Sequence, residues 1–391
     1  MDFRGSAYRQ RHYVYTVLAC ALVLLASAIR VWSFPVVTSD YTYFVAKWFL
    51  ALKENPGLTA FLHPFADYTP AYLYVIKILT WVPLPSLYSV KIFTLLCDLA
   101  IAYTVYVLLR ATTRYTHEQR LLASSITFIA PTLLINSSLW GQSDAVYALP
   151  VLLSLYALLC NRPLWATVWF GVAMSIKLQA IFFLPVIVGY LWHTKRLHEL
   201  IVVPLIYLAL AIPALIGGAT VGEVMGVYLH QSGEYTSLNV SSQSLFAFTD
   251  TLTLAAQTQT LLFWLGITVA LIVAIGGMWL AARTQTPYAY VELTLAVVLL
   301  IPLFLPRMHE RYFYLADLFS LLYAYYDPRH WFVPVLVLSA SFLAYMPFLS
   351  AQVGLFSPIT IDLRIPASML VGVSGYVLWR VASQWRLHAV P

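Results

Sequence analysis

The sequence predicts an all-α polytopic membrane protein, a single membrane domain over residues 1–391 with about 12 transmembrane helices. Hydrophobic residues make up 61% of the chain and charged residues only 10%, whereas a soluble domain has about 25% charged residues. Apolar runs that could cross a bilayer recur along the chain. Cys20, Cys97 and Cys160 all lie inside such runs, so we expect small buried residues rather than a zinc site or a disulfide framework.

Basic residues predict the orientation. Arg4, Arg9 and Arg11 precede the first apolar run, 13–33, so the positive-inside rule places the N-terminus in the cytoplasm. The net charge of +6 fits such residues beside a membrane, and no basic run indicates nucleic-acid binding.

The stretch 70–84 is ambiguous, because about fourteen apolar residues are fewer than the ~20 needed to span. If it crossed the membrane, the arginines that follow run 87–109 would face outside. The charge rule therefore favours an interfacial or re-entrant helix there. Residues 40–53, where aromatic and polar residues alternate at helical spacing, predict a second interfacial helix in the same external loop.

With that choice the chain has twelve spans, both termini are cytoplasmic, and the polar clusters share the opposite face. Two short helices over 163–193 are expected to meet near Lys177 on that face. The expected external loops are 34–86, 137–144, 218–258, 307–311 and 350–366.

Asp40 follows the outer end of the first predicted span. A carboxylate at a membrane–water boundary can act as a general base, because partial burial raises its pKa. The alternative is a helix N-cap, since Thr38-Ser39-Asp40 precedes the amphipathic stretch. The two roles are compatible.

A second polar cluster, Trp140-Gly141-Gln142-Ser143-Asp144, separates two apolar runs. An aromatic face can pack on a sugar ring, and amide and carboxylate groups can bond its hydroxyls. The cluster therefore predicts a sugar-binding patch with Asp144 as a second candidate acid. Taken singly, Asp144 could cap the following helix and Trp140 could belong to an interfacial aromatic belt.

Cations interrupt the apolar pattern at two further places. Lys177, with Gln179, lies at the break between the two short helices, where it could snorkel to headgroups or bind an anion. Arg307, His309 and Arg311 surround Glu310, which suits a lipid phosphate, with headgroup anchoring as the alternative. The residues expected to contact sugar or acceptor are Tyr41, Trp140, Gln142, Gln179, Glu310 and Tyr312.

Three charged residues lie within predicted spans. Lys91 and Asp98 are seven residues apart in one run, hence on one helical face, and we expect them and Asp317 to pair within the bundle, with a proton relay left open.

The ordered set of Asp40, the 140–144 cluster, Lys177-Leu178-Gln179 and His309-Glu310-Arg311-Tyr312 resembles the GT-C superfamily of membrane glycosyltransferases. The likeness extends over about 35–325. It is greatest to the bacterial branch related to the mannosyltransferases of GPI-anchor synthesis and to polyprenyl-phosphate-mannose-dependent enzymes of mycobacteria.

The resemblance implies a GT-C-like helix bundle that moves a sugar, by analogy mannose, from a polyprenyl-phosphate carrier with inversion. It implies Asp40 as the base, and Lys177, Arg307 and Arg311, with His309 beside them, as ligands of the donor phosphate. Many members carry an acidic pair in the first external loop. Tyr41 follows Asp40 here, so Asp144 is the candidate second acid, and a divalent metal is not expected.

The resemblance also implies a lipid-linked or small glycan acceptor and a site on the outer face of a bacterial inner membrane, with membrane lipids as further partners. A transporter or flippase of lipid-linked sugars would instead place charges at the bilayer midplane and repeat its two halves. The polar clusters lie at one face and no repeat is found. A structural subunit is a third possibility, in which Asp40 and Asp144 would be freely replaceable.

Overall fold

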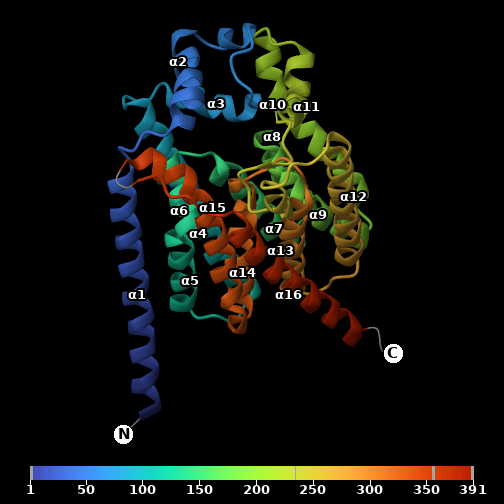
Figure 1. Ribbon diagram of the computed structural model, residues 1–391. Helices are drawn as coiled ribbons and strands as arrows, with labels where there is room; N and C mark the ends of the chain where they lie inside the picture. The colour runs from blue at the N-terminus through green and yellow to red at the C-terminus, as the bar shows by residue number, and fades with distance from the viewer. Residues whose placement is uncertain (1–2, 234, 355–356, 389–391) are drawn as a thin grey trace.

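A helical bundle carries a cap of shorter helices at one end (Figure 1). The computed structural model describes residues 3–233, 235–354 and 357–388, so 355 and 356 of the expected loop 350–366 lie outside it. The first turns of α1 (Phe3–Ser33) and the last turns of α16 (Arg364–His388) lie at the end opposite the cap. The expectation that both ends of the chain share one face therefore agrees with the arrangement of the helices.

Long apolar helices form the bundle. By length and composition, seven helical stretches among the described residues could cross a membrane, or eight if the bent pair His117–Ile129 and Pro131–Trp140 counts as one. The polytopic all-α class is confirmed, whereas the count of twelve is not. The seven are His12–Ser33, Ser86–Thr112 (α4), Leu197–Ile216 (η5, Leu197–Ile201, and α10, Val202–Ile216), Ala256–Ala281 (α12), Pro287–Phe304 (α13), Pro328–Val353 (η8, Pro328–His330, and α15, Phe332–Val353) and Arg364–Gln384.

The prediction of twelve was too high because several apolar runs are broken into short helices. The helix α7 has 16 residues and α8 has 14, which at 1.5 Å per residue gives roughly 21–24 Å, less than a hydrocarbon core of about 30 Å. The shorter elements of this part are α5 (His117–Ile129), α6 (Pro131–Leu134), η3 (Ile135–Trp140), α7 (Asp144–Leu159), α8 (Pro163–Ile176), η4 (Leu178–Phe183), α9 (Leu184–His193) and α14 (Tyr314–Tyr326).

The core lies around α13 and α14. Every residue from Tyr290 to Leu303 is buried, and so is every residue from Tyr314 to Ala324, as expected for helices that are apolar on all sides. Small residues allow close packing at the periphery. A Cβ on Gly189 of α9 would lie 2.3 Å from the Met278 carbonyl oxygen of α12, so a larger residue would separate these two helices.

The cap contains the two short helices that the sequence predicts within 40–53 and 70–84. Helix α3 (Pro70–Leu79) has ten residues, about 15 Å, so it is too short to span. Lys77 within it donates to the carbonyls of Leu52 (2.5 Å) and Asn55 (2.7 Å) at the end of α2, which explains a lysine in an apolar stretch. The cap elements are η1 (Tyr41–Val45), α2 (Ala46–Glu54), η2 (Thr59–Leu62), α3 (Pro70–Leu79) and α11 (Val221–Gly233), whereas η6 (Leu245–Thr249) packs on α13 and α16 of the bundle.

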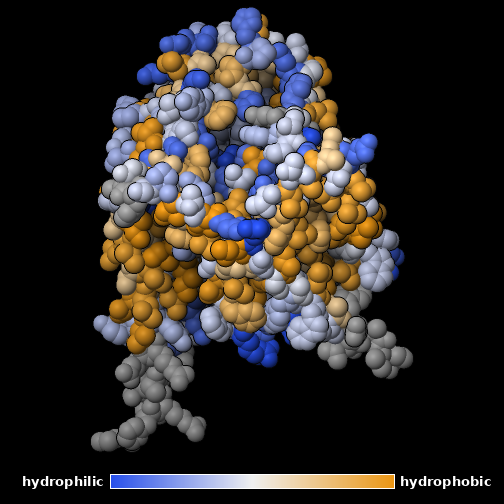
Figure 2. Space-filling model, in the orientation of Figure 1, coloured by the Kyte–Doolittle hydropathy of each residue, from blue (hydrophilic) through white to orange (hydrophobic). Residues whose placement is uncertain are grey.

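The surface follows the same division. Figure 2 shows hydrophobic side chains over the body of the bundle and mixed or hydrophilic ones over the cap, with a hollow in the upper half that contains hydrophilic atoms. Cys20 belongs to the apolar body: it is exposed on α1, whereas Cys97 is buried and Cys160 is intermediate. The expectation that all three are buried is therefore confirmed for Cys97 alone; Cys160 is only partly buried, and the expectation is wrong for Cys20, which lies on a helix that packs on few neighbours.

A short parallel pairing ties two external loops together. Strand β1 (Asn239–Val240) pairs with β2 (Met308–His309), and Ser241 forms a further bridge with His309. The 3-10 helix η7 (Glu310–Phe313) follows at once and leads into α14. The expected loops 218–258 and 307–311 therefore meet, which brings the His309–Tyr312 cluster beneath the cap.

Candidate active site

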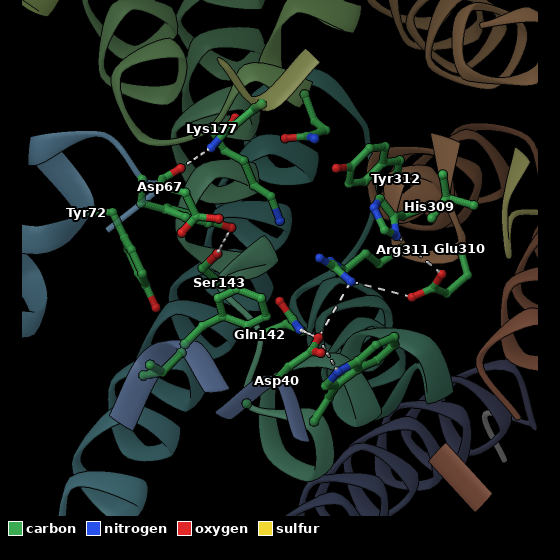
Figure 3. A pocket seen from close by; sticks show the side chains of 18 of the residues that line it. Asp40, Asp67, Tyr72, Gln142, Ser143, Lys177, His309, Glu310, Arg311 and Tyr312 are labelled. Carbon is green, nitrogen blue, oxygen red and sulfur yellow. Dashed lines mark hydrogen bonds and ion pairs between the residues drawn. The ribbon is translucent and has the colours of Figure 1, made fainter. Parts of the chain in front are cut away.

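A cavity of about 300 Å³ lies between the cap and the bundle (Figure 3). Segments from far apart in the chain line it, and nine of the twelve residues predicted for the site are among them. Those nine are Asp40, Trp140, Gln142, Lys177, Gln179, His309, Glu310, Arg311 and Tyr312. The prediction that the three polar clusters meet on one side of the molecule is therefore matched by the structure.

Asp40 is held by three groups on one of its oxygens. Trp140 Nε1 donates to Asp40 Oδ2 at 3.1 Å and Gln142 Nε2 donates to the same atom at 2.6 Å. A guanidinium nitrogen of Arg311 lies 3.7 Å from it, and the Asp40 side chain is 24% exposed. The carboxylate is thus fixed in direction and open to the cavity.

The alternative role of Asp40 as an N-cap is not the one the structure uses. Asp40 itself has helical backbone angles and its side chain makes no cap hydrogen bond. Thr38 takes that place, because its hydroxyl oxygen accepts the Tyr41 N–H at 3.4 Å. The Asp40 carboxylate is therefore left for the cavity.

The sharp turn after η3 determines how the 140–144 cluster is oriented. Gly141 has φ +80°, a left-handed conformation that favours glycine, and the Gln142 N–H returns to the Asn136 carbonyl at 2.9 Å. Trp140 is buried, stacked on Phe348 with centroids 4.8 Å apart. Its ring is therefore packed against protein, and what it offers the cavity is the N–H that holds Asp40.

Asp144 and Lys177 form a tight buried ion pair beside the cavity. Lys177 Nζ bonds Asp144 Oδ1, and Asn136 Nδ2 donates to Asp144 Oδ2 at 2.8 Å. The Asp144 side chain is 0% exposed, and Lys177 alone of the two lines the cavity. Lys177 adopts an extended conformation at the end of α8, just before η4, so the expected break between short helices is confirmed.

The opposite wall is built by β2 and η7. The Glu310 carboxylate lies between two cationic side chains: its Oε1 is 3.5 Å from a guanidinium nitrogen of Arg311, and its Oε2 is 3.8 Å from His309 Nδ1. Figure 3 shows Arg311 between Glu310 and Asp40. Burial raises the pKa of the Tyr312 hydroxyl, which keeps that group a neutral donor. This wall can hold an anion beside a carboxylate.

Arg307 and Tyr41, like Asp144, are predicted site residues that do not line the cavity. Arg307 has φ +62°, and its guanidinium lies over the Phe263 ring, 4.6 Å from the centroid. The Tyr41 hydroxyl lies 2.6 Å from the Ser86 hydroxyl oxygen. The Arg307 side chain therefore packs on Phe263 of α12, whereas Arg311 lines the cavity.

Sequence reasoning missed Asp67, which lines the cavity with Tyr68 and Tyr72. Desolvation raises the pKa of the Asp67 carboxyl, and the Asp67 carbonyl accepts a hydrogen bond from Gln231 of α11 at 2.5 Å. A signal was available, because Asp67 is a carboxylate in the same external loop as Asp40.

The intramembrane charges pair differently from the expectation. Asp98 binds Arg30 at 2.8 Å rather than Lys91, because seven residues along a helix separate two side chains by roughly 10 Å. Lys91 Nζ donates instead to four carbonyls at the junction of α1 and η3, those of Ser33, Phe34, Val36 and Leu139, at 2.7–3.2 Å. Asp317 accepts from the Ser341 hydroxyl at 2.8 Å, and no ion pair joins it to Lys91 or to Asp98's partner Arg30.

Among the described residues, no group of three or more His, Cys, Asp and Glu side chains has the geometry to hold a metal ion.

Comparison with known proteins gives one finding. The model of glycosyltransferase family 87 matches residues 65–306, more than half of the chain. No curated protein matches. The matched range contains Asp67, the 140–144 cluster and Lys177, whereas Asp40 precedes it and Arg311 follows it. The chain belongs to glycosyltransferase family 87.

Proposed function

We propose that this membrane glycosyltransferase takes a sugar from a polyprenyl-phosphate carrier and transfers it with inversion to a lipid-linked or small glycan acceptor. The observation that carries the proposal is the Asp40 carboxylate. It opens into the cavity while Trp140, Gln142 and Arg311 fix its Oδ2 atom. Mannose is the first sugar to test, on the strength of the resemblance.

Asp40 acts as the general base in this mechanism. An acceptor hydroxyl gives its proton to Asp40 as its oxygen forms a bond to the anomeric carbon. The bond from that carbon to the carrier phosphate breaks on the opposite face, so the configuration inverts. The phosphate is already a good leaving group, which makes a base more necessary than an acid.

The cations of the cavity receive the departing phosphate. Arg311 and His309 stand on the η7 side and Lys177 on the α8 side. The ammonium of Lys177 has three donors, so its bond to Asp144 leaves others to meet a phosphate oxygen. We assign the phosphate to these three residues and give Arg307 a lesser part, because it lies on Phe263 outside the cavity lining.

The transporter alternative has less support. Asp98, one of its midplane candidates, is held by Arg30 and Ser137, and the family match points to transfer chemistry.

We further propose that the site faces the outer side of a bacterial inner membrane. The first turns of α1 and the last turns of α16 lie opposite the cap. Gln142→Cys and His309→Cys, each in a variant without Cys20, Cys97 and Cys160, should therefore react with an impermeant reagent from the same side.

The test is incubation of the purified protein with a panel of polyprenyl-phosphate sugars and simple glycosides, followed by mass spectrometry of the products. Transfer from at least one carrier, with release of polyprenyl phosphate, supports the proposal. Transfer from nucleotide sugars alone would overturn it. The same assay with EDTA tests whether a divalent metal is dispensable, as we propose.

A further inference from the structure

A second and larger space adjoins the cavity. It is a groove of about 920 Å³, roughly three times the volume of the cavity, between η1 and α2 on one side and α11 on the other, with the 64–67 loop completing it. Its lining residues include Tyr43, Phe44, Lys47, Trp48, Asp67 and His230.

The groove leads directly to Asp40. Four residues line both spaces, namely Phe44, Trp48, Asp67 and Gln231. Asp40 and Phe44 are four residues apart on one helical segment, hence one turn apart on the same face. A molecule that lies in the groove and extends past Phe44 therefore reaches the proposed base.

The walls of the groove suit an uncharged, hydroxyl-rich ligand. Aromatic rings form a continuous run from the groove into the cavity, with Phe44, Trp48 and Tyr68 at centroid spacings of 6.0 and 5.1 Å. Tyr43 is 63% exposed, with Lys47 Nζ 5.6 Å from its ring centroid. Aromatic faces pack on the apolar faces of sugar rings, and polar groups beside them bond hydroxyls.

The cationic groups of the two spaces differ in number. Lys177, His309 and Arg311 line the cavity, together with the carboxylates of Asp40, Asp67 and Glu310. In the groove Lys47 is the one Lys or Arg among the described lining residues, beside the carboxylates of Asp67 and Glu223, and Glu223 already accepts the Thr220 N–H at 2.7 Å. A second phosphate would meet one lysine and two carboxylates there, which favours a neutral glycan as the ligand.

We propose that the groove is the acceptor site and that it takes a neutral glycan of at least two sugar units, with the terminal unit at Asp40 and the preceding units along Phe44 and Tyr43. The role of the groove as an acceptor site rests on the proposed function, because that function determines which substrate receives the sugar. The groove as a glycan-binding site can be tested without any transfer taking place.

The experiment measures binding of octyl glycosides with one, two and three hexose units to the full-length protein in detergent, by titration calorimetry. Affinity should rise with each unit from one to three. Tyr43→Ala and Lys47→Met, both at exposed groove positions, should remove that gain and weaken the three-unit ligand about tenfold. Trp81→Ala, at a 72% exposed aromatic outside the groove lining, is the matched control and should bind as the wild type does.

Equal affinity for the three glycosides, or full affinity in Tyr43→Ala and Lys47→Met, would overturn the groove as the acceptor site. That result leaves the proposed function standing if polyprenyl-phosphate sugars are still consumed. Conversely, length-dependent binding lost in both variants supports the glycan site even if no donor in the panel is used, in which case only the proposed donor is wrong.

Discussion

Two carboxylates predicted for the site, Asp40 in the cavity lining and Asp144 buried beside it, each face a cation, but the two ion pairs differ in distance and in burial. Asp40 lies 3.7 Å from Arg311 and both side chains are partly exposed. Asp144 bonds Lys177 directly and is fully buried. A carboxylate that must accept a proton and release it needs access to substrate and a loosely held partner, whereas a sealed ion pair serves structure and orientation. Under the proposed function we therefore expect Asp40 to act as the base and Asp144 to position Lys177.

The largest expected effect comes from Asp40→Asn. Asparagine keeps the size of the side chain and can still accept hydrogen bonds from Trp140 and Gln142, yet it cannot take up the proton. Turnover should fall by about 10²–10⁴-fold, the usual range for general base catalysis, with donor binding and the melting temperature retained. Turnover within a few-fold of wild type would move the base elsewhere and break the comparison.

Asp144→Asn should act on stability first. It leaves the buried Lys177 without its counter-charge, and breaking a buried pair in this way typically costs about 3–5 kcal/mol. Thermal unfolding in detergent measures it. Asp144→Asn with Lys177→Met removes both charges and should recover most of the melting temperature, whereas turnover stays low because Lys177 is lost from the cavity. If Asp144→Asn instead unfolds like wild type but is inactive, Asp144 is the base.

The sequence could predict more of this site than of the helix count. Trp140, Gln142 and Asp40 were identified because polar groups at the ends of apolar runs have few structural reasons to be there. Their burial and mutual bonds depend on the left-handed turn at Gly141 and on packing against Phe348, which no local pattern reports. Asp144 and Arg307 show the same limit of sequence-based prediction. Their residue types predicted charged groups at the site, but whether each side chain lines the cavity depends on the path of the backbone.

Spans were harder to predict for a related reason. Apolar composition marks a segment as buried in lipid or in protein but does not distinguish the two. Helices α7 and α14 are apolar because protein surrounds them: 12 residues are buried in one and 11 in the other. The hydrogen bonds from Lys91 to four carbonyls could not be predicted from the sequence either, because they depend on where α1 ends relative to η3.

Arg311→Ala and Arg307→Ala form a matched pair for the donor phosphate. Both remove one guanidinium from the same five-residue stretch, 307–311, but only Arg311 of the two lines the cavity. A charge-assisted contact is typically worth ~1.5–3 kcal/mol, so Arg311→Ala should weaken donor binding by roughly 10–150-fold, while Arg307→Ala should change it far less. Equal losses in the two variants would show that Arg307 reaches the phosphate when donor is bound.

Trp140→Phe has the smallest expected effect, but it tests the geometry of Asp40 most directly, because it removes one of the hydrogen bonds that hold the carboxylate. Phenylalanine keeps an aromatic ring against Phe348 and Tyr345 but has no N–H to give Asp40. Gln142 and Arg311 still hold Oδ2, so the loss should be that of one ordinary hydrogen bond, ~0.5–1.5 kcal/mol, or roughly 2–13-fold in turnover. Since Trp140 orients the base and does not bind the carrier in our proposal, the Michaelis constant for the donor should stay unchanged. A Trp140→Phe protein that keeps full turnover but loses donor affinity would mean that the indole contacts the donor, and the three-point hold on Asp40 would then be incidental to catalysis.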